Sequence, residues 1–139
     1  MSRILIIEDQ SEIRRLIRWS LELEQHEMFE ATNGAAGLKA AQTLGPDLIL
    51  LDVMMPGELD GFQVCERIRA DPVLCAKPVV ILTARAHDRD RDASERAGAD
   101  GYLAKPFSPA ELVKMVQRLL AAPPRAGAVP AALGNAATP

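Results

Sequence analysis

The segment Leu48-Ile49-Leu50-Leu51-Asp52 decides the fold of this chain of 139 residues. Its first four residues are all apolar, and a short apolar run without polar alternation is typical of a strand that is buried on both faces. Such strands occur in parallel sheets, where crossover helices cover both sides. We therefore place residues 48–51 at the centre of a parallel sheet, with Asp52 directly after the strand.

On either side of this segment, apolar strand-like runs alternate with segments of helical period from Arg3 to Leu120. The alternation predicts five strand–helix units and an α/β fold with helices on both faces of the sheet. The other strands are expected at residues 4–7, 28–31, 79–82 and 101–104, of which 28–31 is an edge strand.

Several helix boundaries are marked by capping residues. Asn33 is expected to cap a helix that reaches about Leu44 and stops before Gly45. The segment Ser108-Pro109-Ala110-Glu111 has the pattern of a capping box with a proline in the first turn. Gly98 closes a further helix, whose charged run at 87–92 is expected to face solvent.

The first helix combines an apolar stripe with a basic outer face. Arg14, Arg15 and Arg18 are expected to point away from the stripe, with Trp19 on its flank. Aromatic and arginine side chains are enriched in protein interfaces, so this face is a candidate docking surface. The positions expected to face inward in this helix and in those starting near Gly61 and Ser108 are Ile13, Leu16, Ile17, Leu21, Phe62, Cys65, Ile68, Leu112, Val113, Val116, Leu119 and Leu120.

The composition predicts one globular domain. At 48% hydrophobic and 25% charged residues, with a net charge of -3, it argues against disordered, collagen-like, nucleic-acid-binding and membrane-bound classes. No apolar run approaches the roughly 20 residues that span a bilayer, so we expect a cytoplasmic chain. Cys65 and Cys75 are expected to be reduced thiols. We assign residues 1–122 to the domain and the Ala/Pro/Gly-rich residues 123–139 to a flexible tail or linker.

Polar residues follow four of the five expected strands. Glu8 and Asp9 come after the first, Asp52 after the third, Thr83 after the fourth and Lys105 after the fifth. Taken singly, each has a structural explanation as a helix start, a strand end, a cap or a surface lysine. Because ligands bind at the carboxyl ends of parallel strands, however, all of them are expected at one edge of the sheet.

Three carboxylates at one edge would repel one another unless they share a cation. Ligands that are all oxygen suit Mg²⁺, which also leaves room for a phosphate oxygen. A bound cation would let a carboxylate approach an anionic phosphoryl group, while Lys105 offsets negative charge and Thr83 donates a hydrogen bond. The pattern therefore indicates phosphoryl transfer to a carboxylate.

These residues stand in motifs that resemble the receiver domain of bacterial two-component response regulators. The resemblance covers residues 3–120 and is specific because five motifs occur in order. They are Ile6-Ile7-Glu8-Asp9, Leu50-Leu51-Asp52-Val53-Met54-Met55-Pro56, Asp60-Gly61, Leu82-Thr83-Ala84 and Tyr102-Leu103-Ala104-Lys105-Pro106-Phe107.

The resemblance implies a flavodoxin-like three-layer fold with strand order 2-1-3-4-5. It implies that Asp52 accepts the phosphoryl group, that Thr83 and Lys105 contact it, and that Thr83 and Tyr102 form a switch. It further implies Mg²⁺ or Mn²⁺ held by three carboxylates and a backbone carbonyl, and a cis bond between Lys105 and Pro106. The implied metal ligands are Glu8, Asp9, Asp52 and the carbonyl of Met54.

The resemblance also implies partners. A histidine kinase or phosphotransfer protein supplies the phosphoryl group, and a downstream target or a second copy reads a face made by the fourth helix, fifth strand and fifth helix. With no effector domain in these 139 residues, we expect a stand-alone receiver without direct nucleic-acid or membrane contact. The sequence departs from the family pattern between Pro56 and Asp60, where the loop is one residue longer.

Three alternatives remain from the sequence. A phosphatase of the haloacid-dehalogenase type would need an acid where Met54 stands. A flavin or nucleotide carrier would need glycines and helix-terminus amides in place of Glu8 and Asp9. A receiver-like interaction module without chemistry would not need the acidic set together with Thr83 and Lys105.

Overall fold

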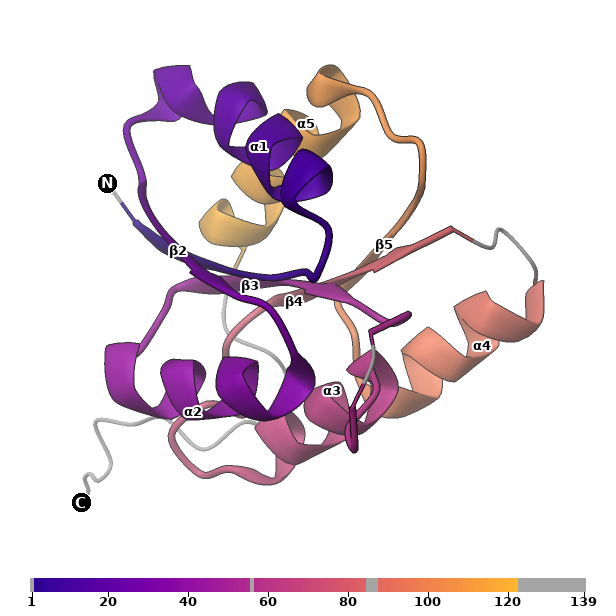
Figure 1. Cartoon of the computed structure of the whole chain (residues 1–139). Helices are drawn as coiled ribbons and strands as arrows, with labels where there is room; N and C mark the ends of the chain where they lie inside the picture. The colour runs from indigo at the N-terminus through magenta and orange to yellow at the C-terminus, as the bar shows by residue number, and fades with distance from the viewer. Residues whose placement is uncertain (1, 56, 85–87, 123–139) are drawn as a thin grey trace.

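The computed structural model describes residues 2–55, 57–84 and 88–122, which form a three-layer α/β sandwich (Figure 1). The five strands are parallel and lie in the order β2-β1-β3-β4-β5. This is the fold class and the strand order that we predicted. The strands are β1 (Arg3–Ile7), β2 (Glu27–Ala31), β3 (Leu48–Asp52), β4 (Val79–Thr83) and β5 (Gly101–Ala104).

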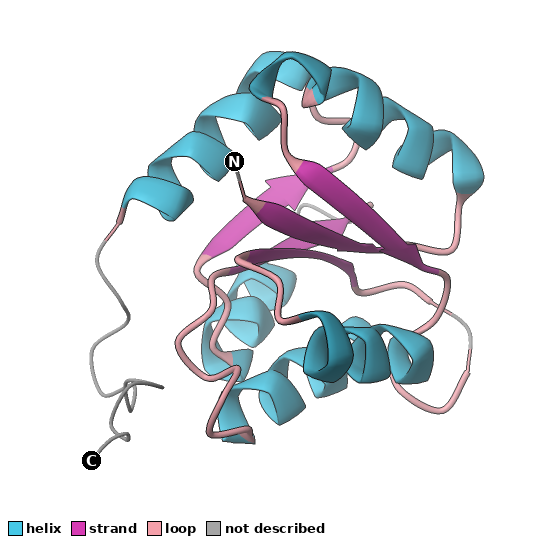
Figure 2. Ribbon diagram, turned by 90° about the vertical axis from the view of Figure 1, so that its left-hand side faces the viewer, coloured by secondary structure: helices cyan, strands magenta, loops and turns pink. Residues whose placement is uncertain are grey.

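Helices cover both faces of the sheet, two on one side and three on the other (Figures 1 and 2). On one side lie α1 (Ser11–Ser20) and α5 (Pro109–Ala121), and on the other α2 (Gly34–Leu44), α3 (Gly61–Ala70) and α4 (Asp88–Ala97). A short 3₁₀ helix, η1 (Glu22–Glu24), connects α1 to β2. This arrangement explains why β3 and β4 are buried at every position.

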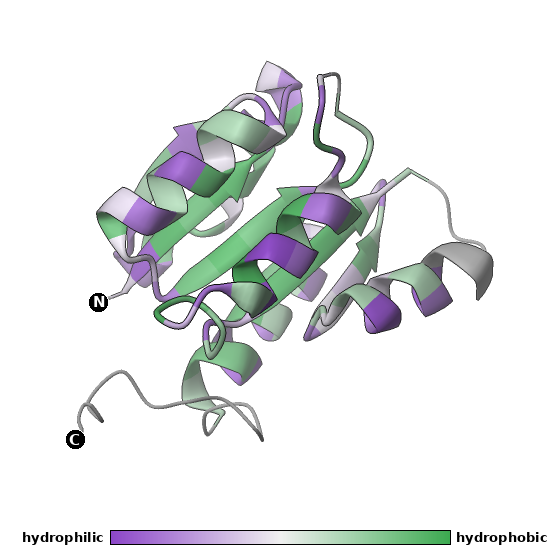
Figure 3. Cartoon of the chain, turned by 90° about the horizontal axis from the view of Figure 1, so that it is seen from below, coloured by the Kyte–Doolittle hydropathy of each residue, from purple (hydrophilic) through white to green (hydrophobic). Residues whose placement is uncertain are grey.

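Two apolar cores lie between the sheet and its helices. Alternate residues of each strand point to opposite faces, so Leu5 and Ile49 pack under α2 and α3, whereas Ile4 and Leu50 pack under α1 and α5. The strands are accordingly hydrophobic over most of their length, and hydrophilic residues concentrate on helices and loops (Figure 3).

The predicted caps are confirmed. The side chain of Asn33 accepts a hydrogen bond from the Ala36 amide, and α2 ends before Gly45. Ser108 and Glu111 form the reciprocal capping box that starts α5. These local signals were reliable because each satisfies backbone amides that a helix start leaves unpaired.

The structure corrects the prediction for two strand ends and for Arg14, and it adds a detail of the loop before α3. Asp52 and Thr83 are the last residues of β3 and β4 and do not follow them. Arg14 does not point freely outward, since its side chain is only 17% exposed and bonds to Glu30. The lengthened loop passes through Gly57, whose φ of 111° belongs to the region that favours glycine.

Parts of the prediction fall outside the described residues, namely Pro56, the loop residues 85–87 and the expected tail 123–139. Within the described part, no helix is both long and apolar enough to cross a membrane. In that part of the chain neither Cys65 nor Cys75 forms a disulfide.

Candidate functional site

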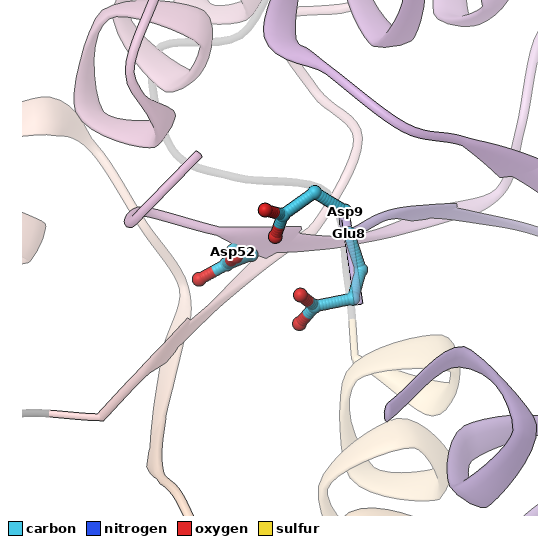
Figure 4. Close-up of side chains that lie close together, drawn as sticks. All are labelled: Glu8, Asp9 and Asp52. Carbon is cyan, nitrogen blue, oxygen red and sulfur yellow. The ribbon is translucent and has the colours of Figure 1, made fainter. Parts of the chain in front are cut away.

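Three carboxylates lie together where β1 and β3 end. Glu8 and Asp9 follow β1 directly, and Asp52 is the last residue of the adjacent central strand β3 (Figure 4). One carboxylate oxygen of each lies within 4.8 Å of the others. The sheet therefore assembles the acidic cluster that we predicted, because parallel pairing of β1 with β3 brings the two strand ends to the same level.

The Met54 amide holds the Asp52 side chain, and the start of α3 packs closely against the Asp52 backbone. The Asp52 side chain is buried, and Oδ1 accepts a hydrogen bond from the Met54 amide at 3.0 Å. Gly61 begins α3 so close to the end of β3 that a Cβ atom there would clash with the Asp52 carbonyl oxygen and the Val53 Cα. The motif Asp60-Gly61 does not by itself reveal this contact, and the close approach explains why a glycine stands there.

Lys105 approaches the acidic cluster from the loop after β5. Its Nζ atom lies 2.8 Å from Oε1 of Glu8 and 3.4 Å from Oδ1 of Asp52. The peptide bond that follows it, to Pro106, is cis. The ammonium group thus supplies one positive charge to a cluster that holds three carboxylates.

Burial raises the pKa of Glu8 to about 7, and the neighbouring Asp52 carboxylate acts in the same direction. The hydrogen bond from Lys105 opposes this shift without cancelling it. Burial favours the neutral acid because the protein interior solvates a charge poorly. A divalent cation would favour the ionised carboxylate instead, so the donor set fits a hard metal ion.

Thr83 and Tyr102, the two residues of the expected switch, lie on the neighbouring strands β4 and β5. Thr83 is buried at the end of β4, next to β3, and its carbonyl accepts from the Lys105 amide at 2.7 Å. Tyr102 pairs with Ile81 in the β4–β5 ladder and is half-buried beside α4. There the Arg91 guanidinium carbon lies 5.7 Å from the centroid of the Tyr102 ring.

Met54, the remaining predicted site residue, directs its side chain mostly to solvent and is 51% exposed. Sequence reasoning missed one contact of the site, which comes from α1: Nη1 of Arg14 donates to the carbonyl oxygen of Glu8 at 2.9 Å. No local pattern signals this bond, because it depends on how α1 packs beside the strand end.

Comparison with known proteins gives consistent matches. A family model described as "Response regulator receiver domain" matches residues 4–117. Among curated proteins, the chain is 43% identical over 119 residues to the transcriptional regulatory protein ResD of Bacillus subtilis, covering 86% of this chain and 48% of that protein. It is 42% identical over 120 residues to the DNA-binding dual master transcriptional regulator RpaA of Synechocystis sp., covering 86% and 49%. The chain therefore spans about half the length of these relatives.

Solved structures agree with the fold. A putative response regulator from Chloroflexus aurantiacus superposes with a TM-score of 0.83 at 34% identity, covering 87% of this chain and 98% of that one. The receiver domain of the sensor histidine kinase PA1611 from Pseudomonas aeruginosa gives 0.80 at 32% identity, with coverage of 87% and 98%. That structure is described as holding a magnesium ion in its active site cleft.

Proposed function

This chain belongs to the response regulator receiver domain family of two-component systems, and on that premise we propose that it accepts a phosphoryl group on Asp52 from a histidine kinase or phosphotransfer protein. Receiver domains are phosphoacceptor signalling modules, which sets this chain apart from the phosphatase and flavin-carrier alternatives. The observation that carries the assignment is the position of Asp52, buried at the end of the central strand, with the acidic pair within 4.8 Å and the Lys105 ammonium 3.4 Å away.

Magnesium, or manganese in its place, is the cofactor that this site fits. We assign its ligands as the carboxylates of Glu8, Asp9 and Asp52 and the carbonyl of Met54, because oxygen-only donors suit these ions. When bound, the ion would supply the positive charge that allows an anionic phosphoryl group near the carboxylates. The magnesium in the cleft of the Pseudomonas aeruginosa receiver domain supports this assignment.

In the proposed reaction a carboxylate oxygen of Asp52 attacks phosphorus. A bond forms between this oxygen and phosphorus, the bond from phosphorus to the histidine nitrogen of the donor breaks, and the nitrogen keeps the electron pair. The product is an acyl phosphate on Asp52. Lys105 offsets the negative charge of the transferring group, and the Thr83 hydroxyl donates a hydrogen bond to one of its oxygens.

We propose that phosphorylation of Asp52 changes the positions of the Thr83 and Tyr102 side chains, and that this change is the signal. When Thr83 turns toward the new phosphoryl oxygen, it vacates space into which the Tyr102 ring can rotate. A tyrosine is stable either packed or exposed, which suits a two-state element. The rotation would change the face formed by α4, β5 and α5.

A downstream target protein or a second copy of this chain is proposed to read this face. It contains a hollow lined by Leu103 and Met115 and bordered by charged residues of α5. An apolar floor with a charged rim is typical of protein interfaces. We further propose that residues 1–122 form the receiver and that residues 123–139 form a tail or linker. We propose that this chain of 139 residues contacts proteins and not nucleic acid or membrane, and that it acts in the cytoplasm.

The proposal is tested by intact-mass measurement after incubation with phosphoramidate and Mg²⁺. We expect one added phosphoryl group in the wild type, and none with EDTA or in Asp52→Ala. Asp92→Ala, which removes an exposed carboxylate of α4, is the matched control and should be labelled like the wild type. Labelling that persists in Asp52→Ala would contradict the assignment of the acceptor.

A further inference from the structure

We propose that Arg14 is a positioning residue for the acidic cluster: it orients the peptide bond that joins Glu8 to Asp9 and so determines how tightly the cluster binds a divalent cation. The inference deepens the proposed function, because it concerns the same metal site. It rests on contacts that tie α1 to the ends of β1 and β2.

Arg14 reaches two elements with one guanidinium group. Nη1 donates to the carbonyl oxygen of Glu8 at 2.9 Å, and Nε donates to Oε1 of Glu30 on β2 at 2.7 Å. An arginine presents its N–H groups in a rigid planar fork, so fixing one of these bonds constrains the direction of the other. The edge strand and the acidic loop are therefore held in one geometry by a single side chain.

The carbonyl that Arg14 binds lies between the two acidic residues. Since a peptide unit is planar, holding the Glu8 oxygen also holds the nitrogen and Cα of Asp9. The Glu8 amide in turn donates to the Ala31 carbonyl at 3.0 Å, at the end of β2. Both peptide units that flank Glu8 are thus fixed, which leaves the side chains of Glu8 and Asp9 preorganised next to Asp52.

Glu30 holds Arg14 in this position. Its two carboxylate oxygens accept from two arginines of α1, Oε1 from Arg14 and Oε2 from Arg18. Glu30 itself is placed by β2, where it pairs with Ile6 of β1. Groups that orient metal ligands in this way commonly determine metal affinity although they do not touch the ion.

Arg18 provides a matched control for Arg14. It lies one turn further along α1 and binds the same Glu30, but its second bond goes to the Met28 carbonyl at 3.2 Å and not to the acidic loop. Loss of either arginine removes an ion pair to Glu30. Only loss of Arg14 removes a bond to the Glu8 carbonyl.

The test measures Mg²⁺ affinity of the full chain by calorimetric titration without any phosphodonor. We expect Arg14→Ala to raise the dissociation constant about tenfold and Arg18→Ala to leave it nearly unchanged. Arg14→Lys keeps a positive charge beside Glu30 without the planar fork, so an intermediate weakening is expected. It also serves as the variant that folds if the alanine variant does not.

A second measurement separates positioning from general stability. Thermal unfolding in EDTA should show losses of similar size for Arg14→Ala and Arg18→Ala, because each variant loses one ion pair to Glu30 and one hydrogen bond to a backbone carbonyl. Labelling by phosphoramidate should need about tenfold more Mg²⁺ in Arg14→Ala, whereas the maximal rate at saturating Mg²⁺ should stay close to that of the wild type. A small donor is used so that docking of a kinase on α1 plays no part.

Unchanged Mg²⁺ affinity in Arg14→Ala, or equal weakening by both alanine variants, would overturn the inference. The proposed function is judged separately, by whether the wild type is labelled on Asp52. A wild type that is not labelled, together with a difference in Mg²⁺ affinity between the two alanine variants, would contradict the function and leave the role of Arg14 intact.

Discussion

The Nζ atom of Lys105 lies 2.8 Å from Oε1 of Glu8, although 97 residues separate the two in the chain. The Glu8 side chain has no exposed surface and that of Lys105 is 12% exposed. The lysine is therefore a cation for a buried carboxylate before any metal or phosphoryl group arrives.

Replacing Lys105 by methionine should destabilise the metal-free protein by about 2 kcal/mol at pH 7, because Glu8 would lose a charge-assisted hydrogen bond and, with its pKa already raised by burial, would take up a proton. Urea unfolding in EDTA measures this change. Added Mg²⁺ should stabilise the variant more than the wild type, since the ion would replace the missing charge, while labelling of Asp52 should be slower. Lys114→Met, on an exposed position of α5, is the control and should show neither effect.

The stability contributed by Glu30 should disappear in acid. Hydrogen bonds from Arg18 and Arg14 lower the pKa of Glu30 below its usual 4.5. A carboxyl whose pKa is lowered by folding stabilises the protein above the unfolded pKa, and this contribution is lost as the pH falls through the folded value. Because the pair is partly exposed, we expect Glu30→Gln to cost about 1 kcal/mol at pH 7.

Urea unfolding of the wild type and Glu30→Gln at several pH values checks this expectation. The difference between them should be constant above about pH 5 and shrink below pH 4.5. If the difference in unfolding free energy stays the same down to pH 3, the negative charge of Glu30 is not what stabilises the folded protein.

Met54 is expected to prolong the life of the phosphoryl group. It follows Asp52 by two positions and its side chain lies at the surface beside the site; we expect this bulky group to hinder an attacking water. Met54→Asn together with Arg85→Ala should speed loss of the phosphoryl group roughly tenfold, a barrier change of about 1.4 kcal/mol. Arg85 lies outside the described residues, so Met54→Asn alone is the informative comparison. The rate is measured by intact-mass analysis after the phosphodonor is removed. If Met54→Asn loses its phosphoryl group at the wild-type rate, Met54 does not hinder the attacking water.

Tyr102 should report the proposed switch, because it is the sole tyrosine of the chain. Labelled with 3-fluorotyrosine, the protein should show one fluorine resonance that moves when beryllofluoride and Mg²⁺ are added. Arg91→Ala should shift the resting resonance, since Arg91 lies over the ring in a contact worth about 0.5–1 kcal/mol. Asp52→Ala is the control and should not respond to beryllofluoride. A wild-type resonance that does not move would contradict a role for Tyr102 in the switch.

Trp19 and Arg15 are expected to contact the kinase or phosphotransfer protein. Trp19 is 65% exposed and, with Glu12, Arg15 and Leu16, lines a hollow on α1. Arg14 and Arg18 bind Glu30, so Arg15 is the better candidate for an interface arginine. Trp19→Ala with Arg15→Glu should slow transfer from a histidine kinase at least tenfold, about 1.4 kcal/mol, and leave labelling by phosphoramidate unchanged. If the kinase transfers the phosphoryl group to this variant and to the wild type at equal rates, the basic face of α1 is a solvated surface and not a docking site.

The positions of the strands, the caps and the acidic edge could be inferred from the sequence because each has a local cause, whereas the strand order was implied only by the resemblance to receiver domains. An all-apolar run such as 48–51 is typical of a strand buried between two helical layers, and Asn33 and Ser108 satisfy amides within their own helix starts. Parallel strands present their carboxyl ends at one edge, so Glu8, Asp9 and Asp52 had to gather there once the strands were identified.

Tertiary structure alone decided how those groups are held. Four contacts join segments that no short-range pattern relates: the bond of Lys105 to Glu8, the bond of Arg14 to the Glu8 carbonyl, the close approach of Gly61 to the Asp52 backbone, and the cation–π contact of Arg91 with Tyr102. Their geometry depends on the twist of the sheet and on how each helix packs against it. Alternation and capping set which residues can meet, whereas packing sets the distances at which their charges and hydrogen bonds act.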